Sequence, residues 1–232
     1  MKYNFLLLKL ILAVFAFSQN TITNKNLEPD ENYREDQFYV SVTYNLIGNK
    51  PNGVSQSGFS SGFHFGFIRD MPINKKRNLA IAAGLGVSSN SYNQNMRISQ
   101  SGANDISFSI IDESQTNVTK NKFTTYLLEF PVEFRWRTST TTDYNFWRIY
   151  PGFKLGYVLY NSTKFNSDSG NEKLSNIDNF NKLQYGFTLS AGYGTWNFHV
   201  YYGLNSIFDN SMLSQEIIDM QFVKIGLMVY IL

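Results

Sequence analysis

The chain lacks cysteine altogether and is poor in charge. None of its 232 residues is a cysteine, which excludes disulfides, thiol nucleophiles, cysteine-based metal sites and a lipid anchor on cysteine. Only 16% of the residues are charged. Beyond the N-terminus, no apolar run is long enough to cross a bilayer as a helix, and this excludes a multi-helix membrane protein.

Aromatic residues are abundant instead. Phe, Tyr and Trp together make up 16% of the chain. A composition that is rich in aromatics and poor in charge is typical neither of a disordered chain nor of a soluble helical domain.

The N-terminus resembles an export signal. A lysine at position 2 precedes an apolar run from Phe5 to Phe17, and small residues at Ala16 and Ser18 come before Gln19. We therefore predict a signal peptide over residues 1–18, with a buried helix as the alternative, and a periplasmic lead-in over residues 19–36. Removal of residues 1–18 leaves 18 basic and 18 acidic residues, and this balance gives no reason to expect a nucleic-acid partner.

From residue 37 onward the hydrophobic pattern repeats every second residue, which indicates strands. Eight strands are predicted, at about 37–47, 58–69, 78–89, 125–137, 146–161, 183–194, 196–205 and 222–232. The pattern is clearest in the fourth, where one face carries Tyr126, Leu128, Phe130, Val132, Phe134 and Trp136 and the other Leu127, Glu129, Pro131, Glu133, Arg135 and Arg137.

Strands of about ten residues with an apolar face and a small or charged face are typical of a transmembrane barrel. Because lipid offers no hydrogen bonds, such a sheet must close on itself. Short turns also alternate with long polar connections, as outer-membrane barrels require. We therefore predict an all-β fold, an eight-stranded antiparallel transmembrane up-and-down barrel over residues 37–232 with a filled lumen. A β-sandwich is the alternative, and the sequence leaves open whether residues 90–124 add short strands.

Aromatic residues also fall at both ends of the outward strand faces. Such rings settle at the level of lipid headgroups. The two predicted aromatic girdles consist of Trp136, Trp147 and Trp196 toward the periplasm, and of Tyr44, Tyr126, Tyr157 and Tyr202 at the other end.

The stretch Tyr126-Leu127-Leu128-Glu129-Phe130-Pro131-Val132 resembles a phrase of the PorT-like outer-membrane β-barrel proteins of Bacteroidota. Residues 150–156, Tyr-Pro-Gly-Phe-Lys-Leu-Gly, are similar to the strand that follows in that family, and Phe17-Ser18-Gln19 looks like its signal cleavage region. The resemblance implies an eight-stranded outer-membrane barrel, some members of which serve type IX secretion.

Catalytic patterns are weak. Residues 58–62 have the Gly-x-Ser-x-Gly spacing of a nucleophile elbow, but no strand precedes the serine and no helix follows it. His64 and His199 have no adjacent carboxylate, so we expect them to fill the lumen and predict no metal site and no cofactor. Glu129 and Glu133 lie four residues apart on one strand face, about 13 Å, which is too far for concerted acid–base work.

Opposite charges are expected to pair inside a narrow barrel. The predicted lumen charge network comprises Glu129, Glu133, Arg135, Arg148 and Lys154, with Glu129 near Lys154 and Glu133 near Arg148 or Tyr150.

The sequence thus predicts a non-enzymatic barrel in the outer membrane of a Gram-negative cell. Its expected role is a structural or accessory subunit of a larger complex, in secretion or outer-membrane protein assembly. A surface adhesin or ligand-binding barrel that uses its extracellular loops is the alternative, and a lipid- or peptide-hydrolysing barrel is a third. Expected partners are the bilayer and other outer-membrane or periplasmic proteins. Apolar residues in the loops, Ile217 and Ile218 in particular, form a candidate docking site.

Overall fold

The computed structural model describes residues 36–100, 102, 105–112, 117–138, 146–168, 170–209, 211–213 and 216–231. The predicted signal peptide, residues 1–18, lies outside the described residues. So does the predicted lead-in, residues 19–36, except for Asp36.

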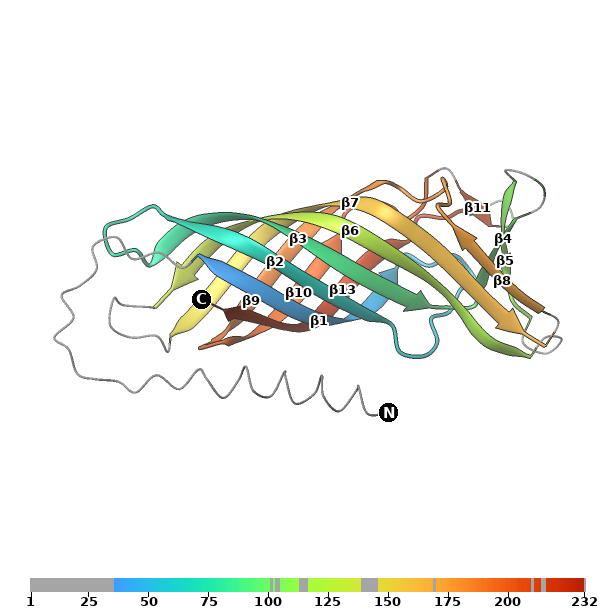
Figure 1. Cartoon of the computed structure of the whole chain (residues 1–232), viewed down its shortest axis with the longest axis horizontal. Coiled ribbons are helices and arrows are strands. Elements are labelled where there is room, and N and C mark those ends of the chain that lie inside the picture. The colour runs from blue at the N-terminus through green and yellow to red at the C-terminus, as the bar shows by residue number, and fades with distance from the viewer. Residues whose placement is uncertain are drawn as a thin grey trace, which may run out of the picture. The chain divides into compact units, whose positions relative to one another are not determined.

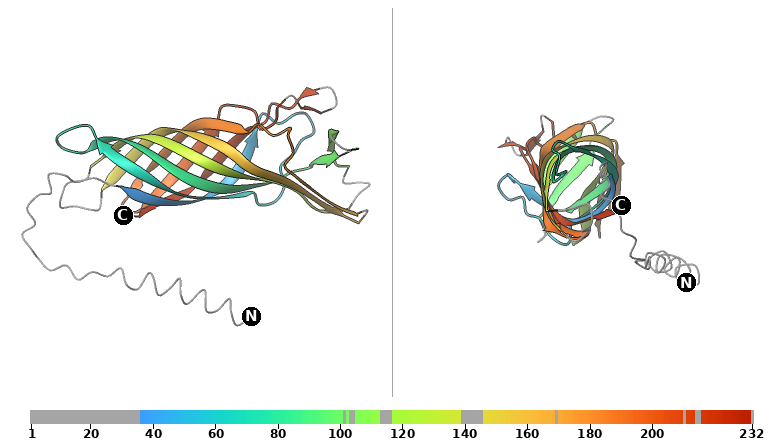
Figure 2. Two further views of the ribbon diagram at one scale, coloured as in Figure 1. Left: turned by 45° about the horizontal axis from the view of Figure 1, so that its top comes forward. Right: turned by 90° about the vertical axis from the view of Figure 1, so that its left-hand side faces the viewer.

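Eight long strands form a closed antiparallel barrel, as the sequence predicts (Figure 1). In chain order they are β1 (Gln37–Gly48), β2 (Ser61–Pro72), β3 (Leu79–Asn93), β6 (Val118–Arg137), β7 (Trp147–Ser167), β9 (Leu183–Tyr193), β10 (Trp196–Gly203) and β13 (Gln221–Ile231). Each strand pairs with its neighbours around the ring. The pairing of β1 with β13 and the pairing of β6 with β7 complete the circle, which is visible end-on in the right-hand view of Figure 2.

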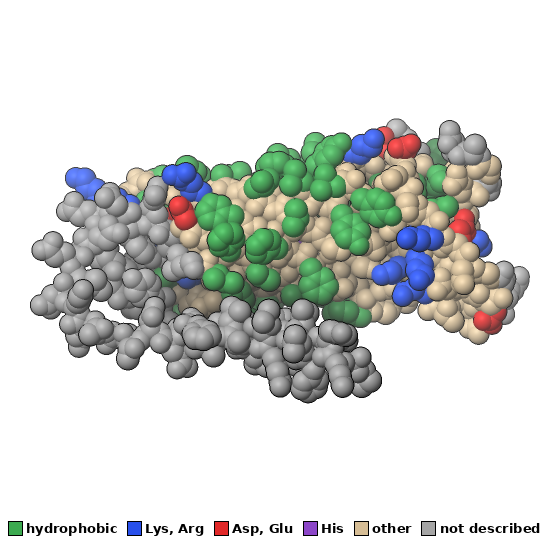
Figure 3. Space-filling model, in the orientation of Figure 1, with side chains coloured by type: hydrophobic (Ala, Val, Ile, Leu, Met, Phe, Trp, Pro, Cys, Tyr) green, Lys and Arg blue, Asp and Glu red, His purple; other side chains and the backbone are tan. Residues whose placement is uncertain are grey.

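Side chains alternate between the barrel exterior and the lumen along every strand. In β1, for example, Phe38, Val40 and Val42 are exposed, whereas Tyr39 and Ser41 are buried. The exposed residues are large and apolar, as a lipid-facing surface requires, and they form the green band in the middle of Figure 3.

Three strands are longer than the sequence pattern predicts: β3 continues to Asn93 rather than ending near 89, and β6 and β7 extend further still. β6 begins at Val118 rather than near 125, and β7 continues to Ser167 rather than ending near 161. The additional residues are polar on their outward side, which makes them look like loops. They pair with one another instead, from Thr125 and Asn161 out to Val118 and Ser167.

The two ends of the barrel differ. At the turn end, the strands are joined by residues 73–78, 138–146 and 194–195. At the loop end lie the short strands β4 (Met96–Gln100), β5 (Ile106–Ile110), β8 (Gly170–Ser175), β11 (Met212–Leu213) and β12 (Glu216–Ile217). Residues 90–124 therefore do add short strands, β4 and β5, which pair with each other.

The buried apolar residues form two clusters. A smaller one, which includes Tyr39, Ile68 and Tyr150, lies within the barrel. A larger one at the loop end joins the mouth of the barrel to the loops. Among the described residues, no helix has the length and apolar character needed to span a membrane.

Candidate functional site: the sealed lumen and the loop end

Glu129 of β6 is the centre of a buried ion-pair cluster. Lys154 of β7 donates from Nζ to Glu129 Oε2 over 3.0 Å, and His64 Nδ1 of β2 lies 3.0 Å from Glu129 Oε1. Only 1% of Glu129 is exposed. The structure thus places Lys154 beside Glu129, where the sequence suggested it. The contact with His64 is new, because it joins strands that are far apart in the sequence.

Glycines make room for this cluster. Glu129 stands directly opposite Gly86 on β3 and Gly156 on β7, neither of which has a side chain to occupy the lumen. Long side chains from diagonal positions on the neighbouring strands, such as Lys154, therefore reach the carboxylate.

A second cluster lies toward the turn end. Arg137 donates from Nη1 and Nη2 to the two carboxylate oxygens of Asp70, over 3.1 and 2.9 Å. Arg135 donates to Asp70 over 3.3 Å and to Glu133 over 3.0 Å, and Tyr230 donates its hydroxyl proton to Glu133 over 3.2 Å. Asp70 and Arg137 were not among the predicted network residues. Asp70 lies one residue past the predicted strand end, although the alternation from His64 through Ile68 already placed it on the inward face.

Arg148 does not lie where the sequence suggested. Its Cζ lies 4.5 Å from the ring centroid of Phe146, and its Nε and Nη1 have no hydrogen-bond partner among the described residues. The strand register explains the difference. Glu133 is opposite Gly152, four residues from Arg148, so about 13 Å of strand separates the two levels.

The lumen is filled at both ends. At the loop end, the ring of Tyr92 stacks on Phe123 and Phe222, with centroid distances of 4.9 and 4.6 Å. At the turn end, Arg135 and Arg137 are completely buried. An eight-stranded barrel is narrow enough for side chains to fill, and these buried groups occupy the lumen at both ends.

Reactive side chains occur in the lumen without an open site around them. Ser190 Oγ lies 2.8 Å from His199 Nδ1, and both residues are buried. Ser60, the serine of the Gly-x-Ser-x-Gly stretch, accepts hydrogen bonds from the backbone N–H of Asn93 and from Gln56 Nε2, over 2.9 and 3.0 Å. Its hydroxyl therefore links the loop that contains Gln56 to the end of β3 at Asn93. Among the described residues, no group of three or more acidic, histidine or cysteine side chains could hold a metal ion.

The apolar loop residues form a cap over the barrel mouth. The cap core includes Val54, Ile98, Ile177, Phe180, Ile207, Phe208, Leu213 and Ile218, packed with Tyr92, Phe123 and Phe222 from the strands. The two residues of the candidate docking site differ in exposure. Ile218 is 1% exposed and belongs to the cap core, so it is unavailable to a partner, whereas Ile217 is 68% exposed.

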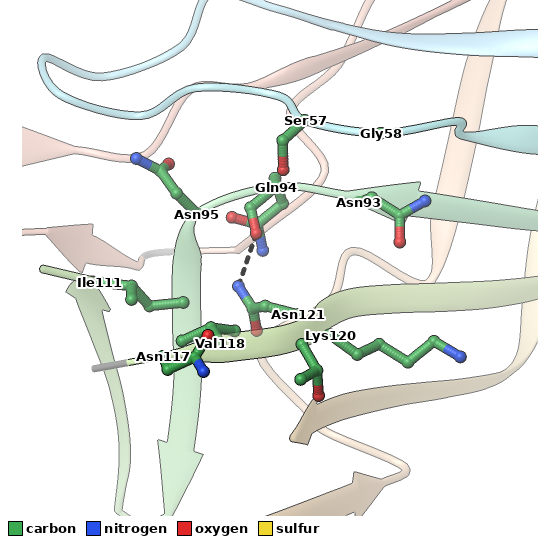
Figure 4. A pocket seen from close by; sticks show the side chains of 11 residues that line it. Ser57, Gly58, Asn93, Gln94, Asn95, Ile111, Asn117, Val118, Lys120 and Asn121 are labelled. Carbon is green, nitrogen blue, oxygen red and sulfur yellow. Dashed lines mark hydrogen bonds between the residues drawn. The ribbon is translucent and has the colours of Figure 1, made fainter. Parts of the chain in front are cut away.

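A polar pocket of about 440 Å³ opens beside the cap (Figure 4). It is lined by Ser57, Gly58, Gln94, Ile111, Val118, Thr119, Lys120 and the asparagines Asn93, Asn95, Asn117 and Asn121. Several of these amides already bind backbone: Asn121 Nδ2 donates to the carbonyls of Gln94 and Met96 over 2.7 and 2.9 Å. No local sequence pattern marks this pocket, since its residues come from four separate segments, 57–58, 93–95, 111 and 117–121.

The aromatic residues assigned to the girdles are all on the barrel exterior. Trp136, Trp147 and Trp196 are exposed near the turn end, and Tyr44, Tyr126, Tyr157 and Tyr202 are exposed toward the loop end. Tyr126 packs against Tyr160 with a centroid distance of 5.8 Å.

A comparison with protein-family models agrees with this architecture. The model of the outer membrane protein beta-barrel domain family matches residues 17–209. The crystal structure of Ail, the attachment invasion locus protein of Yersinia pestis, is 14% identical, with 84% of this chain and 98% of that chain covered and a TM-score of 0.35. A mutant porin from Rh. blastica is 8% identical, with 86% and 100% covered and a TM-score of 0.21. No curated protein matches the sequence significantly. Because the family model matches far more than half of the residues, the chain belongs to the outer membrane protein beta-barrel domain family.

Proposed function

We propose that this outer-membrane barrel is neither an enzyme nor a channel, and that it acts by binding at its loop end. The observation that carries the proposal is the contrast between the filled lumen and the structured loop end. Buried side chains fill the lumen, while the loop end carries β4, β5, β8, β11 and β12, residues of which pack into an apolar cap. A membrane anchor with a shaped external surface is suited to recognition.

One form of this function is an accessory subunit of a larger outer-membrane complex. It is supported by two exposed apolar residues on the small β11–β12 pair, Met212 and Ile217, which face each other in register. Exposed apolar groups at a single site favour a protein partner. The resemblance to PorT-like proteins adds type IX secretion as a candidate setting, and outer-membrane protein assembly is the other candidate.

The other form is a surface adhesin or ligand-binding barrel. It is supported by the polar pocket beside the cap, since amide and hydroxyl groups around about 440 Å³ suit a small polar ligand such as a glycan. Asn117, Thr119 and Lys120 are among its lining residues.

Purification of the native protein from outer membranes in mild detergent separates the two forms. A stoichiometric companion that is lost in Met212→Ser/Ile217→Ser supports the accessory subunit. A lone barrel that binds a glycan, with binding lost in Asn117→Ala/Lys120→Ala, supports the adhesin. Ile73→Ser, at an exposed apolar position of the turn end, is the matched control and should change neither result. Hydrolysis of lipid or peptide by the purified barrel would contradict both.

Export through a cleaved signal peptide is part of the same proposal. N-terminal sequencing of the mature protein should begin at Gln19. A mature protein that retains Met1 would contradict the proposed cleavage.

A further inference from the structure

Three lysines stand side by side where β6, β7 and β8 extend past the barrel. Lys122 of β6 is the register partner of Lys164 on β7, and Lys164 is also the partner of Lys173 on β8. We call these three residues the lysine row. Lys120 lies two residues before Lys122 and so shares its face. All point outward, because the alternate residues Phe123 and Phe165 are buried.

Like charges directly opposite one another on neighbouring strands destabilise a sheet. The row has no acidic partner among the described residues. The acidic residue of β8, Glu172, belongs to the opposite face, where its Oε2 accepts a hydrogen bond from Arg97 over 2.8 Å. Partial burial, together with the charges of Lys120 and Lys164, lowers the pKa of Lys122, which lies beyond the membrane-spanning part of β6. A bound anion would relieve this repulsion.

The row lies just outside the lipid-facing surface. On the same outward face of β6, Tyr126 follows Lys122 by four residues, about 13 Å along the strand. Tyr126 packs on Tyr160, and tyrosines at such positions settle at headgroup level. Figure 3 shows Lys and Arg side chains gathered on this side, beyond the green apolar band and toward the loop end. The lysines therefore lie on the outer side of the headgroup level that Tyr126 marks.

An apolar hollow of about 500 Å³ lies on the outward face of the same part of the wall. The exposed side chains that line it are Val40, Phe63, Phe65, Val87, Tyr126 and Leu159, from β1, β2, β3, β6 and β7. Tyr126, which lies four residues from Lys122 on the outward face of β6, is one of the residues that line this hollow. Its lining suits a hydrocarbon chain, and the lysines above it suit phosphate.

We propose that the lysine row binds the phosphate groups of a phosphorylated glycolipid in the outer leaflet, with one of its acyl chains in the apolar hollow. Lysine ammonium groups bind phosphate as point charges, and three in a row match a headgroup that carries more than one phosphate. The site does not depend on binding at the loop end, so it can be tested separately from the proposed function.

The test measures equilibrium binding of fluorescently labelled bis-phosphorylated lipid A to the purified full barrel in zwitterionic detergent. Each lysine near a charged lipid surface contributes about fivefold in affinity, so Lys122→Gln/Lys164→Gln/Lys173→Gln should bind about 100-fold more weakly. The single change Lys164→Gln should weaken binding about fivefold. The matched control, Lys75→Gln/Lys76→Gln in the turn of residues 73–78, should stay within twofold of wild type. The wild-type affinity should also fall as salt is raised.

Further probes identify the source of the phosphate. Dephosphorylated lipid A should compete poorly, and inorganic phosphate at the same concentration should not compete. Equal losses in the row variant and in the control would show unspecific attraction and overturn the proposal. Displacement by inorganic phosphate alone would overturn the assignment to a lipid. All variants should keep the unboiled gel mobility of the folded barrel, and if the triple variant does not, the single Lys164→Gln result decides.

Discussion

Glu129 and Lys154 face each other across β6 and β7 at 3.0 Å, inside a lumen where both are almost completely buried. Removal of one partner leaves a buried charge without its counterion, which costs about 3–5 kcal/mol. Glu129→Gln should therefore lower the free energy of unfolding by several kcal/mol in urea titrations of the barrel in detergent. The double variant Glu129→Gln/Lys154→Gln should lose less than the sum of the two single changes.

The matched control is the partly exposed pair of Arg97 and Glu172, whose side chains meet at 2.8 Å at the loop end. Glu172→Gln should cost about 0–1 kcal/mol, because water already screens this pair. Additive losses for Glu129 and Lys154, or equal losses for Glu129→Gln and Glu172→Gln, would show that the buried cluster does not act as a unit.

Depth in the membrane gives the second prediction. Phe130 and Trp136 are both outward residues of β6, but Phe130 is closer to the middle of the strand. Phe130→Arg should cost about 2–4 kcal/mol of refolding free energy, and Trp136→Arg about 0–1 kcal/mol, since arginine is tolerated near the headgroups. Refolding into vesicles measures both. The same loss for the two variants would show that Trp136 is not at an interface.

The third prediction concerns the packing of Tyr39 in the lumen. A Cβ at Gly66 would lie 2.5 Å from Tyr39 Cζ and 2.6 Å from the backbone carbonyl oxygen of Leu85, both too close for any ordinary contact. Gly66→Ala should therefore cost about 1–3 kcal/mol in the same urea titration. Gly48→Ala is the control, since its Cβ would meet Val223 Cγ2 at 3.7 Å. Tyr39→Leu should restore only part of the stability of Gly66→Ala, because the contact with the Leu85 carbonyl remains. If Tyr39→Leu restores none of it, the ring does not contribute to the cost.

The closed lumen gives the fourth prediction. Because Tyr92, Phe123 and Phe222 fill the mouth and Arg135 and Arg137 fill the opposite end, the barrel should show no steady current in planar bilayers. Stable single-channel steps from the purified wild-type protein would contradict a filled lumen.

The sequence was sufficient to predict the barrel because lipid imposes a strict alternation. Residues such as Phe130 and Glu129 can then be assigned to opposite faces from their odd or even position along the strand alone. Eight segments with this alternation predict the eight-stranded fold. The polar ends of β6 and β7 were missed because, outside the lipid, their outward residues are no longer apolar.

The lumen was only partly predictable. Pairing across one short turn suggested that Lys154 lies near Glu129, since β6 and β7 are consecutive along the barrel. His64 and Asp70 come from β2, and their contacts with β6 depend on glycine positions and side-chain reach across the lumen. Whether Ile218 is buried likewise depends on how distant loops pack, and no local sequence pattern indicates this.

The central claim, a closed barrel whose strands all pair, is tested most directly by heat-modifiability in gel electrophoresis. A barrel without free edges should stay folded in cold SDS and shift its apparent mass only after boiling. Unboiled and boiled samples of the refolded protein should therefore migrate as two distinct bands. Identical migration of the two samples, with a helical far-UV circular dichroism spectrum in detergent, would contradict the barrel.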